Sequence, residues 1–250
     1  MKARQLAWDG CLNVRDLAGH PTSDGGETRF GAIVRTDTVH GLSDDGWRSL
    51  VDYGIGTIVD LRGDHERADD PPRALDISVV HAPFMEANEG EWRAIDAELE
   101  QVNAQAAGAS RTREVYLIFL EHFRDNVGAA FRAVARAPED GVVIHCVGGK
   151  DRTGLLTAFL LHVAGVDVDE IAADYALSEE RLRPRTQAWL DAAETEAERE
   201  EILHISRTPA EVIPGVFEEL GRRYGGVEAY LRAAGVDDDD LAHARARLRG

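Results

Sequence analysis

Two residues that bracket a short loop, Cys146 and Arg152, are the best placed in this chain to do chemistry. The β-branched run 142–144 before the loop predicts a buried strand, and the apolar residues after Thr153 recur at helical spacing. The first amides of a helix have no partner within the helix and carry the positive end of its dipole. The strand–loop–helix turn therefore predicts an anion site.

The residue types within the loop suit a phosphoryl group. Glycine lets the backbone approach an anion closely, and Arg152 offers a planar fork that matches two phosphate oxygens. The field at the helix start favours thiolate over thiol at Cys146, which could then attack phosphorus in line. We expect His145 to order the loop from behind and Thr153 to donate its hydroxyl to the sulfur. The candidate phosphate-binding residues are Val147, Gly148, Gly149, Lys150 and Thr153.

The segment HCVGGKDRTG resembles the signature of the cysteine-dependent phosphatases, and its GKDRTG ending is similar to a bacterial tyrosine-phosphatase branch. The segments LNVRDLAG and IVDLR resemble further motifs of that branch, in the same order. The resemblance implies that Cys146 is the nucleophile and that Arg152 binds the phosphoryl oxygens. It also implies a general acid, for which Asp151, inside the loop, ranks first. Glu86 ranks second, by its position in a separate loop.

Four charged residues of the two outer motifs are predicted to support the site rather than to react. Asp60 and Arg62 are expected to brace the phosphate loop by hydrogen bonding. Arg15 and Asp16 are expected to act as a paired structural staple of the N-terminal segment.

The alternation of strand and helix patterns predicts an α/β fold, with a mainly parallel sheet of four to five strands flanked by helices. Ligands bind at the carboxyl ends of the strands of such sheets, where the loop would lie. We expect one phosphatase domain over residues 1–250. Within it, 86–112 is a candidate lid insertion, and 166–250 forms a helical C-terminal part.

Three local expectations concern the helices. Residues 108–110 are predicted to break the helix that starts near Glu89. Residues 115–137 are predicted to form one helix with a kink near Gly128. Trp189 is predicted to be buried on a charged helical stretch at 182–205.

Composition excludes several classes of function. The net charge of −18 leaves no general basic face for nucleic acid. The presence of only two cysteines, Cys11 and Cys146, argues against a disulfide scaffold, although a redox pair of the two stays open. The apolar runs are too short to span a bilayer, and the N-terminus lacks a secretory signal. The cytoplasm is therefore expected, although export without a signal would leave no trace.

The sequence thus predicts a metal-independent, cysteine-dependent phosphatase that needs no cofactor. Its substrate would be a phosphorylated protein or a phosphoinositide, the latter suggested by the extra positive charge of Lys150. A sulfurtransferase, an arsenate-reductase-like thiol enzyme and a non-catalytic phosphate-binding module remain alternatives. The sequence leaves open the preferred substrate and the oligomeric state.

Overall fold

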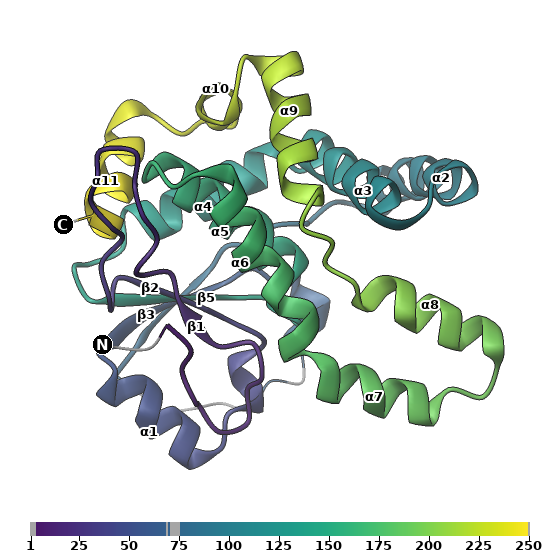
Figure 1. Cartoon of the computed structure of the whole chain (residues 1–250), viewed down its shortest axis with the longest axis horizontal. Helices are drawn as coiled ribbons and strands as arrows, with labels where there is room; N and C mark the ends of the chain where they lie inside the picture. Colours follow the sequence, from purple (N-terminus) through teal and green to yellow (C-terminus); the bar gives the residue numbers. More distant parts are fainter. Residues whose placement is uncertain (1–3, 69, 71–75, 250) are drawn as a thin grey trace.

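Figure 1 shows the computed structural model of the chain, which describes residues 4–68, 70 and 76–249. A five-stranded sheet with the order β1-β2-β5-β3-β4 lies at its centre. All neighbouring strands are parallel except β1, which is antiparallel to β2. The predicted α/β fold is confirmed. The strands are β1 (Arg15–Asp16), β2 (Ile33–Thr36), β3 (Ile55–Asp60), β4 (Ser78–His81) and β5 (Gly141–His145).

Strand register brings the carboxyl ends of the three central strands to one edge. His145, the last residue of β5, lies opposite both Thr36 on β2 and Asp60 on β3. The loop after β5 therefore starts between two neighbouring strand ends. This is the edge where parallel sheets bind ligands.

Helices cover both faces of the sheet, because side chains of β5 alternate between two cores. Val142 and Ile144 belong to the large core under α4 and α5, and Val143 packs on the side of α1. The helices of the described residues are α1 (Asp44–Asp52), α2 (Glu89–Gln105), α3 (Gly108–His122), α4 (Arg124–Ala135), α5 (Asp151–Val163), α6 (Val168–Arg181), α7 (Arg183–Ala192), α8 (Glu196–Ser206), α9 (Val212–Tyr224), α10 (Val227–Ala233) and α11 (Asp238–Arg249). Within this described part, none is both long and apolar enough to cross a bilayer.

Two of the helix expectations were wrong in position. The chain breaks at residues 106–107, and Gly108 opens α3 instead of ending α2. The stretch 115–137 is interrupted at Phe123, between α3 and α4, and not at Gly128. Gly128 instead allows α4 to approach the backbone of Ala234 closely, since a Cβ at position 128 would lie 1.8 Å from the carbonyl oxygen of Ala234.

Helices α7 and α8 form a hairpin that projects from the body of the molecule (Figure 1). Thr195 begins α8 with a capping box, in which its hydroxyl accepts a hydrogen bond from the amide of Glu198. Trp189 on α7 is 41% exposed, so the prediction that it is buried was wrong. A projecting helix pair has too little core to enclose a side chain of that size.

Candidate active site

Cys146 directly follows β5 and lines a pocket of about 410 Å³. The loop turns sharply at Gly149, whose φ of 61° favours glycine, and a Cβ there would lie 2.2 Å from the carbonyl oxygen of Thr36. Helix α5 begins at Asp151, so its free amides face the loop. The pocket is lined by Leu99, Asn103, Arg111, Thr112, Val115, Tyr116, Phe119, Cys146, Val147, Gly148, Lys150, Asp151, Arg152, Leu182, Arg185, Thr186, Trp189, His204, Ile205, Ser206 and Arg207.

Side chains from the N-terminal third hold the carbonyl groups at the back of the loop. The amide nitrogen of Asn13 donates to the carbonyl oxygens of Gly148 (3.1 Å) and Gly149 (3.0 Å). Arg35 Nη2 donates to the same Gly149 oxygen at 2.7 Å. Because these carbonyls are engaged from behind, the loop amides are left to face an anion in the pocket.

One buried carboxylate on α6, Asp174, gathers the arginines behind the loop. Arg15 Nε and Arg35 Nη1 donate to it at 3.0 Å and 2.8 Å, and Arg4 adds a bond of 2.7 Å. Burial alone would raise the pKa of Asp174, but the charges of Arg15 and Arg35 hold it well below its usual range. Asp174 thus stays ionised inside the protein.

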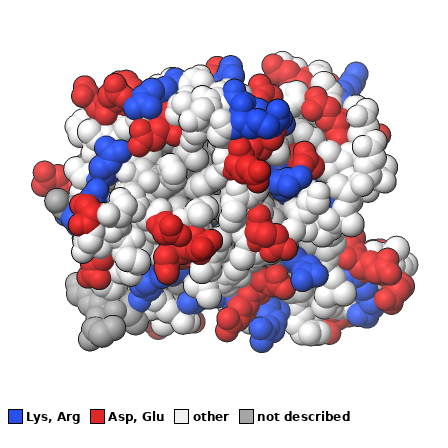
Figure 2. Space-filling view, turned by 45° about the horizontal axis from the view of Figure 1, so that its top comes forward, with Lys and Arg blue, Asp and Glu red and all other residues white. Residues whose placement is uncertain are grey.

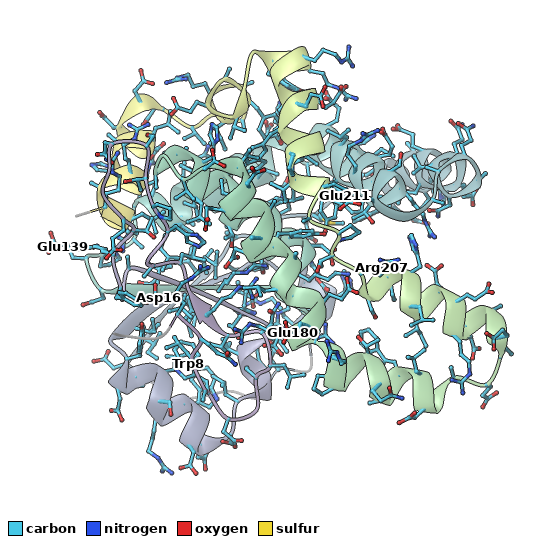
Figure 3. All side chains as sticks on the ribbon, viewed as in Figure 1. Trp8, Asp16, Glu139, Glu180, Arg207 and Glu211 are labelled. Atoms are coloured by element: carbon cyan, nitrogen blue, oxygen red, sulfur yellow. The ribbon has the colours of Figure 1, made fainter. Side chains whose placement is uncertain are left out.

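The predicted pair of Arg15 and Asp16 has structural contacts, but these are with other residues. Arg15 bonds to Asp174, whereas Asp16 accepts hydrogen bonds from the amide of Gly31 (2.7 Å) and the hydroxyl of Tyr53 (2.5 Å). Asp16 is labelled in Figure 3 and belongs to β1, the strand at one edge of the sheet. Both residues are buried, so each fastens the N-terminal segment to the body separately.

Arg152, the phosphate-binding candidate, is paired with a carboxylate that comes from the segment after β3. Both its Nη atoms donate to Glu66, the Nη2 bond measuring 2.7 Å, and the amide of Gly63 donates to Glu66 at 2.9 Å. Burial alone would lower the pKa of Arg152, but the bonds to Glu66 and the nearby sulfur of Cys146 raise it above its usual range. Glu66 therefore orients the guanidinium and keeps it charged.

Asp60, Arg62 and His145 lie together near the carboxyl ends of β3 and β5, but among the described residues the Arg62 side chain bonds to Asp60, Glu66 and Asp70 and not to the loop, so bracing of the loop by Asp60 and Arg62 stays a prediction. Asp60 accepts from Arg62 Nε (3.0 Å) and Nη2 (2.8 Å). Burial lowers the pKa of His145 to about 4 despite the charge of Asp60, so the ring is neutral at pH 7. Its Nδ1 lies 3.1 Å from the carbonyl oxygen of Cys146, which can only accept, so Nδ1 carries the proton. In this group, the contact with the loop is the hydrogen bond from His145 to the backbone of Cys146.

Asp151 lines the pocket and is held by a tyrosine pair that the sequence patterns did not single out as part of the site. The Tyr116 hydroxyl donates to Asp151 Oδ1 at 2.6 Å and lies 2.8 Å from the hydroxyl of Tyr175. Burial and the charge of Asp151 hold the pKa of Tyr116 well above its usual range, so the phenol keeps its proton. The Asp151 carboxylate is therefore held at the start of α5, beside the loop that carries Cys146.

The other predicted site residues differ in where they lie. Glu86 is exposed and is not among the pocket residues of the described chain; its Oε2 lies 3.3 Å from where a Cβ on Gly63 would be. The Thr153 hydroxyl is buried with no hydrogen-bond partner among the described residues, so the expected bond to Cys146 is not formed. Lys150 lines the pocket, and its Nζ bonds to the carbonyl oxygen of Ile205 on α8.

The two candidate thiols are both free. Cys11 donates to the carbonyl oxygen of Thr38 at 3.3 Å, and burial together with the charge of Asp37 raises the pKa of its thiol to about 12. The thiol of Cys11 therefore stays protonated at neutral pH and is a poor nucleophile.

One group of side chains outside the pocket has the composition of a cation site. Single ligand atoms of His40, Asp60 and Asp70 lie within 4.8 Å of one another. However, Arg62 bonds to both carboxylates, and Arg67 Nε lies 3.2 Å from Asp60. Two guanidinium groups already neutralise these carboxylates, so the group fits a buried ion-pair network better than a metal.

Two segments far apart in sequence complete the pocket wall. Leu99, Asn103, Arg111 and Thr112 come from the predicted lid region, which therefore borders the pocket; its movement stays a prediction. The α7–α8 hairpin adds Arg185, Trp189 and Arg207, which no sequence motif had indicated. Figure 3 shows Arg207 where the chain leaves α8. On the face in Figure 2, acidic and basic side chains are interspersed, with no extended basic area.

Comparison with known proteins agrees with this geometry. Residues 6–250 match the model of the tyrosine phosphatase family. The tyrosine-protein phosphatase of Nostoc commune is 28% identical over 227 residues, which cover 87% of this chain and 74% of that protein. The triple specificity protein phosphatase PtpB of Mycobacterium tuberculosis is 26% identical over an alignment that spans both chains completely. This chain belongs to the tyrosine phosphatase family.

Proposed function

We propose that the protein hydrolyses phosphotyrosine through a phosphocysteine intermediate on Cys146. The observation that carries the proposal is the position of this thiol: it lines the pocket at the end of β5, in the loop that leads to the free amides of α5. Arg152 lies in the first turn of that helix and lines the same pocket. A thiolate beneath an anion that these donors hold is aligned for attack on phosphorus.

In the first step, the Cys146 sulfur forms a bond to phosphorus while the bond from phosphorus to the ester oxygen breaks. Asp151 begins this step protonated on Oδ2, while its Oδ1 accepts the Tyr116 hydrogen bond, and gives its proton to the departing oxygen. In the second step, a water oxygen attacks phosphorus, the sulfur–phosphorus bond breaks, and the water proton passes to Asp151. Arg152 and the loop amides stabilise the equatorial oxygens in both transition states. Because the guanidinium and the helix dipole supply positive charge, the proposed reaction uses no metal.

Asp151 is the better candidate for the acid because it lines the pocket and Tyr116 orients it. Glu86 lies beside Gly63, outside the pocket residues. The pocket volume of about 410 Å³ falls within the range of ligand pockets, roughly 300–1,000 Å³. We therefore include phosphoserine, phosphothreonine and phosphoinositides as further substrates to test, all of them phosphate monoesters.

The test is phosphate release from peptides that carry phosphotyrosine or phosphoserine and from phosphatidylinositol phosphates, with EDTA present. Cys146→Ser is expected to abolish release, while Cys11→Ser, the matched control, retains it. Acid quenching during turnover should trap a phosphoryl group on the wild-type protein and none on Cys146→Ser. Release that survives in Cys146→Ser would refute the mechanism. Phosphate binding by the wild type without release from any substrate would refute the proposed function.

A further inference from the structure

The pocket contains a guanidinium group that no described carboxylate neutralises. Within the described residues the pocket is lined by five arginines and lysines and by a single carboxylate, in a chain of net charge −18. Three of these cations have a carboxylate partner: Arg152 pairs with Glu66, Arg111 with Glu201 (3.4 Å) and Lys150 with Asp151 (3.5 Å). Arg185, on the α7–α8 hairpin, has no carboxylate partner in the described part of the chain. An uncompensated guanidinium in an otherwise acidic protein indicates an anion that is not part of the chain.

The Arg185 guanidinium rests directly on the anion-binding loop. A Cβ built on Gly148 would lie 2.7 Å from Arg185 Nη2 and 3.6 Å from its Cζ. Gly148 stands two positions after Cys146, and both residues line the pocket with Arg185. The absence of a side chain at Gly148 is thus what allows the guanidinium to reach the loop.

The Arg185 side chain has a contact that holds it in place, but its N–H groups lack hydrogen-bond partners among the described residues. Its Cζ lies 4.9 Å from the ring centroid of Trp189, one helical turn along α7, which is the geometry of a cation–π contact. Arg185 Nε is buried without a hydrogen-bond partner among the described residues. The contact with Trp189 holds the group without neutralising it, so its N–H donors stay available.

We propose that Arg185 is a second substrate-binding guanidinium, which contacts the phosphoryl group held in the loop in addition to Arg152. The inference rests on the proposed function of this site. The base of the hairpin fixes its position, since Leu182, between α6 and α7, is buried at 3% exposure. Trp189, although it lies on an exposed helix, thereby has a role in orienting this arginine.

The test measures the dissociation constant of inorganic phosphate by calorimetry. The protein is the full chain with Cys146→Ser, so that turnover plays no part. Arg185→Gln is expected to weaken phosphate binding about tenfold, the loss typical of one charge-assisted hydrogen bond. The matched control is Arg183→Gln, which removes the same charge from an exposed position of α7 outside the pocket residues. It is expected to change the constant less than twofold.

Gly148→Ala tests the same contact independently, because it displaces the Arg185 guanidinium from the loop without removing it. The φ of Gly148 is not in the left-handed region, so the backbone accepts alanine, and the nearest atom to the new Cβ belongs to the flexible end of Arg185. Gly148→Ala should therefore weaken phosphate binding by displacing Arg185. In the double variant with Arg185→Gln, the loss should be no greater than in Arg185→Gln alone.

The outcomes separate this inference from the proposed function. Equal phosphate affinity of the Arg185→Gln and Arg183→Gln variants overturns the inference, whether or not the wild type releases phosphate from esters. Fully multiplicative losses in the double variant also overturn it, because Gly148→Ala would then act without Arg185. Loss of affinity confined to Arg185→Gln and Gly148→Ala supports it even if the wild type proves inactive on phosphate esters.

Discussion

Replacing Asp174 with asparagine removes a buried negative charge while the shape of the side chain stays the same. Asp174 is 2% exposed and is the carboxylate shared by Arg15 and Arg35, which are 1% and 0% exposed. Asparagine keeps one oxygen acceptor but leaves two buried guanidinium groups without a counter-charge. Removing one partner of a buried ion pair costs about 3–5 kcal/mol.

We take about 3 kcal/mol for Asp174→Asn, because the remaining amide oxygen can still accept one bond. In a domain of this size, that lowers Tm by roughly 6–12 °C. Urea denaturation at pH 7 measures the loss, and Asp169→Asn, an exposed change on the same helix, should stay within about 0.5 kcal/mol of wild type. Activity should fall as well, since Arg35 also holds the Gly149 carbonyl oxygen at 2.7 Å. An unfolding free energy within about 1 kcal/mol of wild type would refute the reasoning.

The loss of stability caused by Asp174→Asn should also become smaller as the pH falls. Because the folded pKa of Asp174 lies below its usual range, its contribution is present above the unfolded value, about 3.9. The contribution is lost as pH falls through the folded pKa. The stability difference between wild type and Asp174→Asn should therefore be constant from pH 8 to about pH 5 and shrink below about pH 4. A difference that grows on acidification would contradict an ionised Asp174.

Three further predictions concern residues around the loop. Tyr116→Phe removes the 2.6 Å bond to Asp151 and should lower kcat about tenfold with little change in KM, measured by phosphate release against Tyr224→Phe, a control away from the pocket. Thr153→Val replaces a buried hydroxyl that has no partner, so the variant should be as stable as wild type within about 1 kcal/mol or more stable, and a larger loss in urea would show a hidden bond. The pKa of His145 in the folded protein is about 4, below its unfolded value, so the wild type should lose stability as the pH falls from about 6.5 to 4. Denaturation curves across this pH range should show a smaller loss for His145→Gln.

The sequence is informative wherever structure and chemistry are local. Residues 142–144 alternate between the two cores of the sheet, and the glycines that follow fit the turn that the loop makes. For the same reason the loop and the central strand were predictable. The break between α3 and α4 was not predictable, because phenylalanine at position 123 is not a residue type that interrupts helices. The position of Gly128 inside α4 was not predictable either, because its reason is the close packing against Ala234, which only the structure shows.

The contacts that hold the candidate site together were not predictable, because the partners are distant in sequence and ordinary in type. Glu66 reaches Arg152 across 86 positions, and Arg35 reaches Asp174 across 139. Tyr116 falls on an apolar helix stripe that is typical of core residues. Its contact with Asp151 is made by the hydroxyl group and becomes visible only in the structure. The prediction that Trp189 is buried was wrong for a related reason. Large aromatic residues are usually well buried, but here the ring orients an arginine at the pocket.

Helix α6 links the back of the loop to its front. Its Asp174 holds Arg35, which in turn holds the Gly149 carbonyl oxygen from behind. The same helix ends at Arg181, and with buried Leu182 the chain passes directly into α7, which carries Arg185 over Gly148. Both sides of the anion site are thus connected to α6, which packs on α5. Because Leu182 alone separates α6 from α7, we expect a shift of α6 to displace the Gly149 carbonyl group and the Arg185 guanidinium together, so that weaker anchoring of α6 by Asp174 lowers phosphate affinity.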